Sequence, residues 1–123
     1  MKFAVVEQKY IDYWRDRQAK EKQYHQMLAK QARQEAQQIV DWLVQRYPVQ
    51  RVILFGSLAR DRFVAASDID LAVEGLPPAN YFEILAQVNQ LTARWVDLKL
   101  WQDLEPHFKS RVLETGEVLY ERK

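Results

Sequence analysis

The sequence contains no cysteine among its 123 residues. This absence excludes disulfide bonds and thiolate metal sites, and it is typical of a cytoplasmic protein, the location that we expect. The chain also lacks any stretch approaching the roughly 20 apolar residues that span a bilayer. Its N-terminal apolar run is too short for a signal peptide. We therefore expect no association with membranes.

An excess of charge of either sign is also missing. Lysine and arginine total 18 and aspartate and glutamate total 17, which gives a formal net charge of +1. A strong positive field, which would favour nucleic acid or an anionic membrane, is therefore absent. We expect no direct nucleic-acid partner, and a length of 123 residues suits one domain.

Glycine and proline are scarce, with three and four copies, and neither occurs between Val6 and Tyr47. That stretch is rich in good helix formers and predicts a long helix with at most one break. Five apolar residues recur at helical spacing in its second half and predict the face that covers the domain: Leu28, Ala32, Ala36, Ile39 and Leu43. We therefore divide the chain into an N-terminal helical extension, residues 1–27, and a domain, residues 28–123.

The first part of this helix carries a second apolar stripe, made of Phe3, Val6, Tyr10 and Tyr13, with Trp14 beside it. An almost wholly polar run, RDRQAKEKQ, separates the two stripes. A helix that extends beyond a small domain cannot bury such a stripe alone, which favours contact with a second copy or with a different partner. The alternative is a bent helix that packs this stripe on its own sheet.

After Pro48 the pattern changes to short apolar strands and intervening helices. We expect strands at residues 51–55, 69–73, 96–100 and 118–120, and helices at residues 80–92 and 104–115. The apolar face of the first of these helices is predicted to carry Phe82, Leu85, Val88 and Leu91. The expected fold class is α+β in layers: a small mixed β-sheet packed by helices and preceded by the long N-terminal helix.

Gly56 and Ser57 directly follow the first predicted strand. Glycine lets the backbone turn sharply and lets a phosphate approach closely, and Ser57 can cap a short helical turn at residues 58–61. Exposed N–H groups at such a turn are natural donors to phosphate. Taken alone, the pair more often marks an ordinary turn between a strand and a helix.

Asp68 and Asp70 alternate with the apolar residues of the second predicted strand. Residues two apart in a strand point to the same face, so both carboxylates leave the core together. Such a pair can bind hard, oxygen-seeking metals such as magnesium, although a solvent-facing pair of acids gives the same pattern. An EF-hand is excluded because the residues that follow, Leu71 to Val73, are apolar where a calcium loop needs oxygen ligands.

A third acid, Asp97, lies in the third predicted strand, on the face that also carries Lys99. If this strand pairs with the second, Asp97 joins Asp68 and Asp70. Three carboxylates beside a phosphate-binding turn are the parts that metal-assisted phosphoryl transfer needs. The alternative for Asp97 is a surface ion pair with Lys99 or with an arginine.

Taken together, the run Val52 to Arg60 and the run Ser67 to Val73 resemble the polymerase β-like nucleotidyltransferase superfamily. Within it, they are most similar to the minimal nucleotidyltransferase (MNT) group, whose Gly-Ser and Asp-x-Asp pairs are also ten residues apart, as Ser57 and Asp68 are here. The resemblance covers residues 49–100, or extends to the C-terminus if the last helix is included, and it implies the nucleotidyltransferase fold.

The resemblance also implies roles for individual residues. Gly56 and Ser57 would contact the triphosphate of ATP, and Arg60 matches a common arginine of the family. Asp68 and Asp70 would bind two Mg²⁺ ions, for which Mn²⁺ can substitute. Asp97 matches the third acidic position, as metal ligand or general base. Asp61 stands where members usually have glycine, which could alter the turn or repel phosphate.

Many MNT proteins are antitoxins that transfer AMP from ATP to a tyrosine of a HEPN toxin. The HEPN signature, an arginine four to six residues before a histidine, is absent here, since Arg17 and His25 are separated by seven. The resemblance therefore implies the antitoxin half of such a pair, a metal-dependent nucleotidyltransferase. The alternatives are transfer to a small molecule and a relative that binds its toxin without catalysis.

Overall fold

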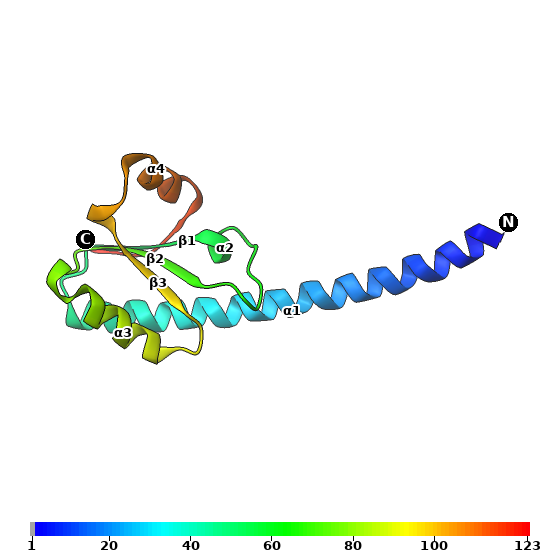
Figure 1. Cartoon of the computed structure of the whole chain (residues 1–123), viewed down its shortest axis with the longest axis horizontal. Helices are drawn as coiled ribbons and strands as arrows, with labels where there is room; N and C mark the ends of the chain where they lie inside the picture. The colour runs from blue at the N-terminus through cyan, green and yellow to red at the C-terminus, as the bar shows by residue number, and fades with distance from the viewer. Residues whose placement is uncertain (1) are drawn as a thin grey trace.

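A computed structural model describes the backbone of residues 2–123 and the side chains of residues 7–123. Its first element is helix α1 (Lys2–Arg46), which runs for 45 residues and extends far beyond the rest of the molecule (Figure 1). The sequence allowed one break, and the helix has none. The reason is that proline and glycine, which most often kink a helix, first occur at Pro48 and Gly56.

Helix α1 has two parts that differ in burial. Every side chain from residue 7 to residue 27 is exposed, and Leu28 is the first that is buried. The five residues predicted to cover the domain are all buried, which confirms that stripe: Leu28, Ala32, Ala36, Ile39 and Leu43. The boundary proposed between residues 27 and 28 coincides with this change.

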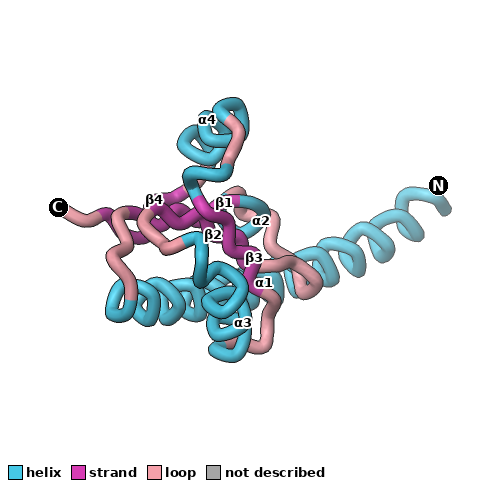
Figure 2. The backbone as a smooth tube through the Cα atoms, turned by 60° about the vertical axis from the view of Figure 1, so that its left-hand side comes forward, coloured by secondary structure: helices cyan, strands magenta, loops and turns pink. Residues whose placement is uncertain are grey.

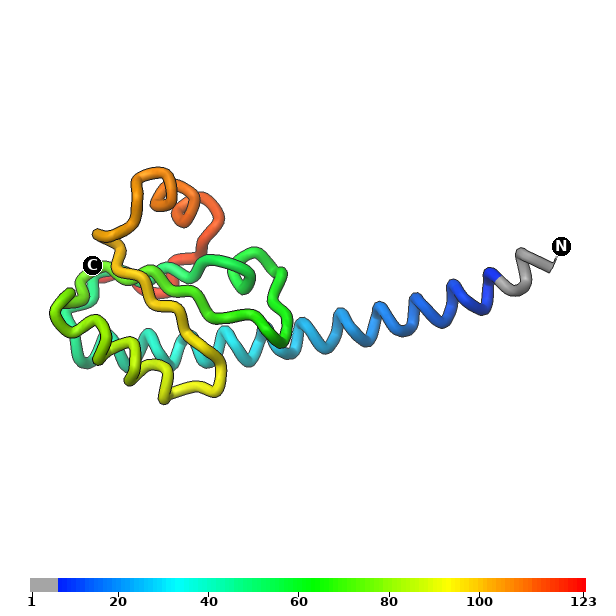
Figure 3. The backbone as a smooth tube through the Cα atoms, viewed as in Figure 1, coloured from blue at the N-terminus to red at the C-terminus, as the bar shows by residue number. Residues whose placement is uncertain are grey.

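The outer stripe of α1 does not fold back on the domain. Tyr10, Tyr13 and Trp14 are 59%, 57% and 52% exposed, while the side chains of Phe3 and Val6 lie outside the described residues. The interpretation that a bent helix buries this stripe on its own sheet is therefore wrong for the described part. The uninterrupted helix carries residues 7–27 away from the domain (Figure 3).

The sheet has four strands in the order β3-β2-β1-β4. Their bounds are β1 (Arg51–Phe55), β2 (Ile69–Glu74), β3 (Val96–Leu100) and β4 (Glu117–Glu121). Strand β1 is antiparallel to both of its neighbours, whereas β2 and β3 are parallel and are joined through a helix. The sheet is therefore mixed, as predicted, and the fold class is α+β.

Helices cover both faces of this sheet (Figure 2). The second part of α1 and helix α3 (Tyr81–Leu91) pack on one face and enclose the larger core. Helix α4 (Pro106–Thr115) packs on the other, where Val112 meets Ile53, Phe55 and Ala72. A short helix, α2 (Gly56–Ala59), follows β1, and 3₁₀ turns occupy Pro78–Asn80 and Trp101–Asp103.

The apolar face predicted for helix α3 is right for Val88, which is buried, and for Leu85, which packs against the core, and wrong for Phe82 and Leu91. Phe82 is 82% exposed and Leu91 is 40% exposed, whereas Ile84 and Val88 are buried. The cause is long-range, because the Tyr81 hydroxyl donates a hydrogen bond of 2.5 Å to the carbonyl of Leu98 on β3. This contact turns Tyr81 toward the sheet and its neighbour Phe82 away from it.

No helix of the described residues combines the length and the apolar character that crossing a membrane requires.

Candidate active site

The candidate site lies on the face of the sheet opposite α1, where β1 ends and β2 begins. Asp70 on β2 is aligned with Phe55 on β1 and with Asp97 on β3. Adjacent strands are about 4.8 Å apart, so the parallel pairing of β2 and β3 places Asp70 and Asp97 side by side. The structure therefore joins two of the acids that the sequence separates by 26 positions.

The ionisation of Asp70 reflects this crowding. Burial, followed by the negative charges of Asp97 and then Asp68, raises the pKa of Asp70 from 3.8 to about 6, and Lys99 opposes the shift. Asp68, exposed just before β2, is close enough to contribute to this shift. A cation placed here would relieve the repulsion among the carboxylates.

Asp97 also makes the ion pair that the alternative interpretation proposed. The ammonium of Lys99 lies 3.4 Å from the Asp97 carboxylate, and both side chains are more than a third exposed. Lys99 is two residues along β3, so it shares the face of Asp97. The pair is weak in water, and its formation leaves Asp97 beside Asp70.

Gly56 is required by its contact with Asp70. A β-carbon on Gly56 would lie 2.2 Å from Oδ2 of Asp70, which is far inside any allowed contact. The residue also has a φ of +75°, which side-chain-bearing residues rarely adopt. The turn that follows β1 therefore lies in close contact with the carboxylate of Asp70.

Ser57 does not cap the helical turn after it, contrary to the prediction. Helix α2 begins two residues earlier than expected, at Gly56, and its N-cap position is Phe55, with no side-chain cap hydrogen bond. The positive φ of Gly56 starts the turn immediately after the strand, so Ser57 lies inside the helix. Its carbonyl accepts a hydrogen bond of 2.8 Å from the backbone N–H of Arg62, which closes the turn.

Arg60 and Asp61 end this turn. Arg60 is exposed, and none of the acidic side chains in residues 7–123 forms an ion pair with it. Asp61 has a φ of +55°, the left-handed conformation that glycine adopts most easily and that aspartate tolerates better than most residues. Asp61 therefore keeps the turn that a glycine would allow.

The acids of this site suit magnesium binding when the phosphates of a bound triphosphate supply further ligands. Among the side chains of residues 7–123, no three acidic or histidine groups form a complete metal site. Magnesium, however, is usually held by one or two carboxylates together with substrate phosphates and water. The aligned Asp70 and Asp97 provide such a pair, with Asp68 nearby.

Tyr81 and Asp103 were not predicted to be part of this region. With Lys99, Leu100 and Leu104 they line a depression at the β3 edge of the site. Burial raises the pKa of Tyr81, and the charge of Asp97 adds to this effect. The sequence carries no local signal for this grouping, which depends on how α3 and the turn after β3 pack.

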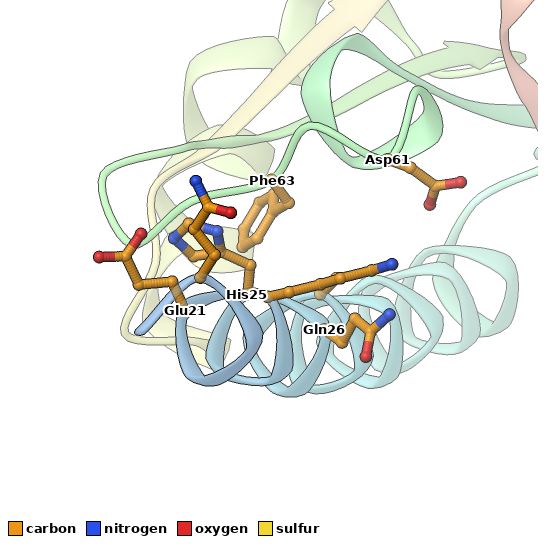
Figure 4. A pocket seen from close by; sticks show the side chains of 8 residues that line it. Glu21, His25, Gln26, Asp61 and Phe63 are labelled. Carbon is orange, nitrogen blue, oxygen red and sulfur yellow. The ribbon is translucent and has the colours of Figure 1, made fainter. Parts of the chain in front are cut away.

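A second hollow lies between α1 and the loop after α2, on the far side of the sheet (Figure 4). Phe63 points from this loop toward His25, and Asp61 lies at its rim. His25 is exposed, as is His107 on α4, and neither lies among the acids of the candidate site. We refer to this feature below as the α1 hollow.

Comparison with known families agrees with the geometry. A family model described as polymerase beta, nucleotidyltransferase, matches residues 37–123. The chain belongs to this nucleotidyltransferase family. The match spans all four strands and the candidate site, and it leaves out the exposed part of α1.

Individual relatives of this nucleotidyltransferase are distant. A Methanocaldococcus jannaschii protein provisionally described as a protein adenylyltransferase is 26% identical over 69 residues. That alignment covers 56% of this chain and 53% of the relative, so the chain spans about half the length of the curated protein it matches.

Two solved structures share the fold. A chain of a toxin–antitoxin complex crystallised with AMP-PNP is 25% identical, with a TM-score of 0.63 over 72% of this chain and 74% of its own. A chain of a Shewanella oneidensis complex, in which a tri-AMPylated HEPN toxin binds an MNT antitoxin, is 22% identical, with a TM-score of 0.59 over 74% and 73%. At 22% identity the second likeness concerns the fold alone.

Proposed function

We propose that this nucleotidyltransferase transfers AMP from ATP to a tyrosine hydroxyl of a partner HEPN toxin and thereby acts as an antitoxin in the cytoplasm. The observation that carries the proposal is the alignment of Asp70 with Asp97 beside Gly56. The distant likeness to a protein adenylyltransferase and to a toxin–antitoxin complex crystallised with AMP-PNP supports the choice of donor and acceptor.

The donor side of the site would hold the triphosphate of ATP. Gly56 and Ser57 form the turn that lies against Asp70, and backbone N–H groups at such a turn are natural donors to phosphate. Arg60, exposed at the end of this turn, can pair with a phosphate oxygen. Asp68, Asp70 and Asp97 would hold Mg²⁺ or Mn²⁺, and the metal would offset the negative charge of the phosphates.

For this reaction the chain needs to supply little more than positioning of the reactants and one proton acceptor. The tyrosine oxygen forms a bond to the α-phosphorus, the bond from that phosphorus to the bridging oxygen breaks, and pyrophosphate leaves. The hydroxyl proton goes to a carboxylate. Asp97 is the group proposed for this role, because it lies at the edge of the carboxylate cluster and is partly exposed.

An exposed site of this kind suits a protein acceptor. Asp68 and Arg60 are exposed, and the described residues provide no second domain that could close over a small molecule. A partner that brings its own surface would supply the positioning on which phosphoryl transfer depends. AMP on a tyrosine replaces a neutral hydroxyl with a bulky anion, which could block an RNA-binding cleft.

The test combines the protein with its partner toxin, ATP and magnesium, followed by intact mass measurement and peptide sequencing. We expect AMP on a tyrosine of the toxin, and we expect the Asp68→Asn/Asp70→Asn double variant to lose both transfer and metal-dependent ATP binding. Asp41→Asn is the matched control, since Asp41 is an exposed acid on α1. An unmodified toxin together with AMP on a small metabolite would refute the acceptor, and unchanged metal-dependent ATP binding in the double variant would refute the site.

A further inference from the structure

Phe82, on the first turn of α3, is 82% exposed, more than any other large apolar side chain in residues 7–123. A single exposed apolar side chain is ordinary on a protein surface, so its exposure alone assigns it no role. Its neighbour is more informative. The ring of Phe82 lies edge-on to the ring of Tyr81, with 5.3 Å between their centres, and Tyr81 lines the depression at the β3 edge of the candidate site.

This depression is large enough for one aromatic side chain. Its volume is about 320 Å³, whereas an enclosed cavity of about 150 Å³ already holds a benzene ring. Leu100 and Leu104 contribute apolar lining, and Asp103 adds an exposed carboxylate. Apolar walls with one or two polar groups are typical of sites that hold an aromatic ring with a polar end.

The depression lies beside Asp97, the carboxylate proposed to accept the hydroxyl proton. Lys99, which also lines it, places its ammonium 3.4 Å from the Asp97 carboxylate. Burial raises the pKa of Tyr81, Asp97 adds to the rise, Lys99 opposes it and Asp103 adds again. Both acids are therefore within electrostatic reach of the Tyr81 hydroxyl.

The order of parts across the sheet separates the donor from an acceptor. In phosphoryl transfer the attacking and leaving oxygens are in line, so the acceptor and the departing pyrophosphate lie on opposite sides of the phosphorus. The Gly56 turn, proposed to hold the triphosphate, follows β1. Asp70 lies on the next strand, and Asp97 lies on β3, at the edge of the sheet. The depression comes after Asp97 in this order and is therefore on the acceptor side.

The opposite side of the site is covered by the chain itself. Helix α4 packs over β1, where the ring of Phe108 lies edge-on to the ring of Phe55, with 5.7 Å between their centres. Phe55 is the residue aligned with Asp70. The α1 hollow lies on the far side of the sheet from these acids (Figure 4). These contacts favour the β3 edge as the side from which an acceptor arrives.

We propose that the acceptor protein docks on the β3 edge, with Phe82 as an apolar anchor and with the side chain of its acceptor tyrosine in the depression. We call Phe82 and the depression the acceptor surface. This assignment rests on the proposed function, since it places the tyrosine of that reaction. The acceptor surface selects a tyrosine that has a lysine or arginine next to it, because Asp97 and Asp103 repel an acidic neighbour.

The first arm of the test measures AMP transfer to the partner toxin at varied toxin and ATP concentrations. Phe82→Ala should raise the KM for the toxin by about tenfold or more and leave the KM for ATP unchanged, because aromatic anchors carry much of the energy of an interface. Leu91→Ala is the matched control, since it truncates an apolar side chain, 40% exposed, at the other end of the same helix. It should leave both KM values unchanged.

The second arm measures binding without transfer. Two blocked peptides, Lys-Tyr-Lys and Glu-Tyr-Glu, are titrated into the full-length ¹⁵N-labelled chain and followed by NMR. Lys-Tyr-Lys should shift the amide signals of Phe82, Asp103 and Leu104, and should bind about threefold or more tightly than Glu-Tyr-Glu. Asp103→Lys should reverse this preference, whereas Asp41→Lys, the same change at an exposed acid on α1, should not.

The two arms separate this surface from the function on which it rests. A toxin that is modified with the same KM by Phe82→Ala and by the wild type would overturn the acceptor surface and leave the proposed function standing. An equal rise of KM in Leu91→Ala would also overturn it. The peptide arm decides even when the toxin stays unmodified: shifts confined to other residues, or an unchanged peptide preference in Asp103→Lys, would exclude the acceptor surface.

Discussion

At the scale of single residues, the pKa of Asp70 is raised by its burial and by the neighbouring acids. Its pKa in the folded protein is raised to about 6 from an ordinary value of 3.8, so the folded state binds a proton more tightly than the unfolded state. The associated stability is fully present below pH 3.8 and is lost as the pH rises through about 6. Ionised Asp70 therefore opposes folding at neutral pH when no metal is bound.

The first prediction follows from the direction of this pKa shift, which makes ionised Asp70 destabilising. In the presence of a chelator at pH 7.5, Asp70→Asn should raise the free energy of unfolding by roughly 1 kcal/mol, a value discounted for solvent screening. The difference should vanish below about pH 4, where the wild-type group is protonated. Urea unfolding at the two pH values measures it, and an asparagine variant less stable than the wild type at pH 7.5 would contradict the argument.

Asp97 allows a second prediction that separates binding from turnover. A general base acts on the acceptor hydroxyl more than on the bound triphosphate, so Asp97→Asn should keep ATP binding within about tenfold and abolish AMP transfer. Calorimetry and a transfer assay give the two quantities. Wild-type transfer by this variant would mean that Asp97 serves only its ion pair with Lys99.

At the scale of elements, the turns that follow β1 and β2 depend on glycine for different reasons. A β-carbon on Gly75 would lie 2.5 Å from the backbone carbonyl of Pro48, which cannot move away, whereas one on Gly56 would meet the Asp70 side chain. Both residues have positive φ, so the backbone strain of an alanine is common to both.

Gly75→Ala should therefore cost roughly 2 kcal/mol or more in unfolding free energy, through displaced backbone. Gly56→Ala should cost less stability, because Asp70 can turn aside, but it should lose metal-dependent ATP binding. Chemical denaturation and calorimetry of both variants make the comparison. Equal losses of stability with ATP binding retained in Gly56→Ala would show that the Gly56 turn is purely structural.

The elements also show what the sequence could predict. The strands and helices were found to within one or two residues at most ends, because apolar alternation, helix formers and Gly56 mark them locally. The face of α3 was predicted only in part, with Phe82 and Leu91 misplaced, since its orientation depends on the hydrogen bond from Tyr81 to a strand that follows it in the chain. The start of α2 was missed because Gly56 itself enters the helix, with a positive φ that the sequence pattern does not specify.

The positions of the acids of the site were also predicted only in part from the sequence. The spacing of Asp68 and Asp70 predicted a shared strand face, whereas in the structure β2 begins at Ile69 and Asp68 lies just before it. Asp68 is nevertheless close enough for its charge to raise the pKa of Asp70. The position of Asp97 required the parallel pairing of β2 and β3, which a strand pattern alone does not specify. Asp61 was expected to alter the turn, but aspartate can adopt the left-handed backbone that this position needs.

At the scale of the whole molecule, we propose that the outer part of α1 is separable from the domain. The side chains of residues 7–16 are all exposed, so their removal costs the domain no packing. Deleting residues 1–16 should leave the unfolding free energy within about 0.5 kcal/mol of the wild type and ATP binding unchanged. Chemical denaturation and calorimetry measure the two quantities, and loss of the folded core would show that the extension is part of the domain.

The uninterrupted course of α1 also governs how this molecule moves through water. A helix of 45 residues is about 65 Å long, several times the radius of gyration of roughly 13 Å expected for a compact domain of this size. Such a rod drags solvent along most of its length, so the chain should diffuse more slowly and tumble less uniformly than a sphere of equal mass. On a gel-filtration column a single copy would then emerge early, at the position of a compact protein considerably heavier than itself.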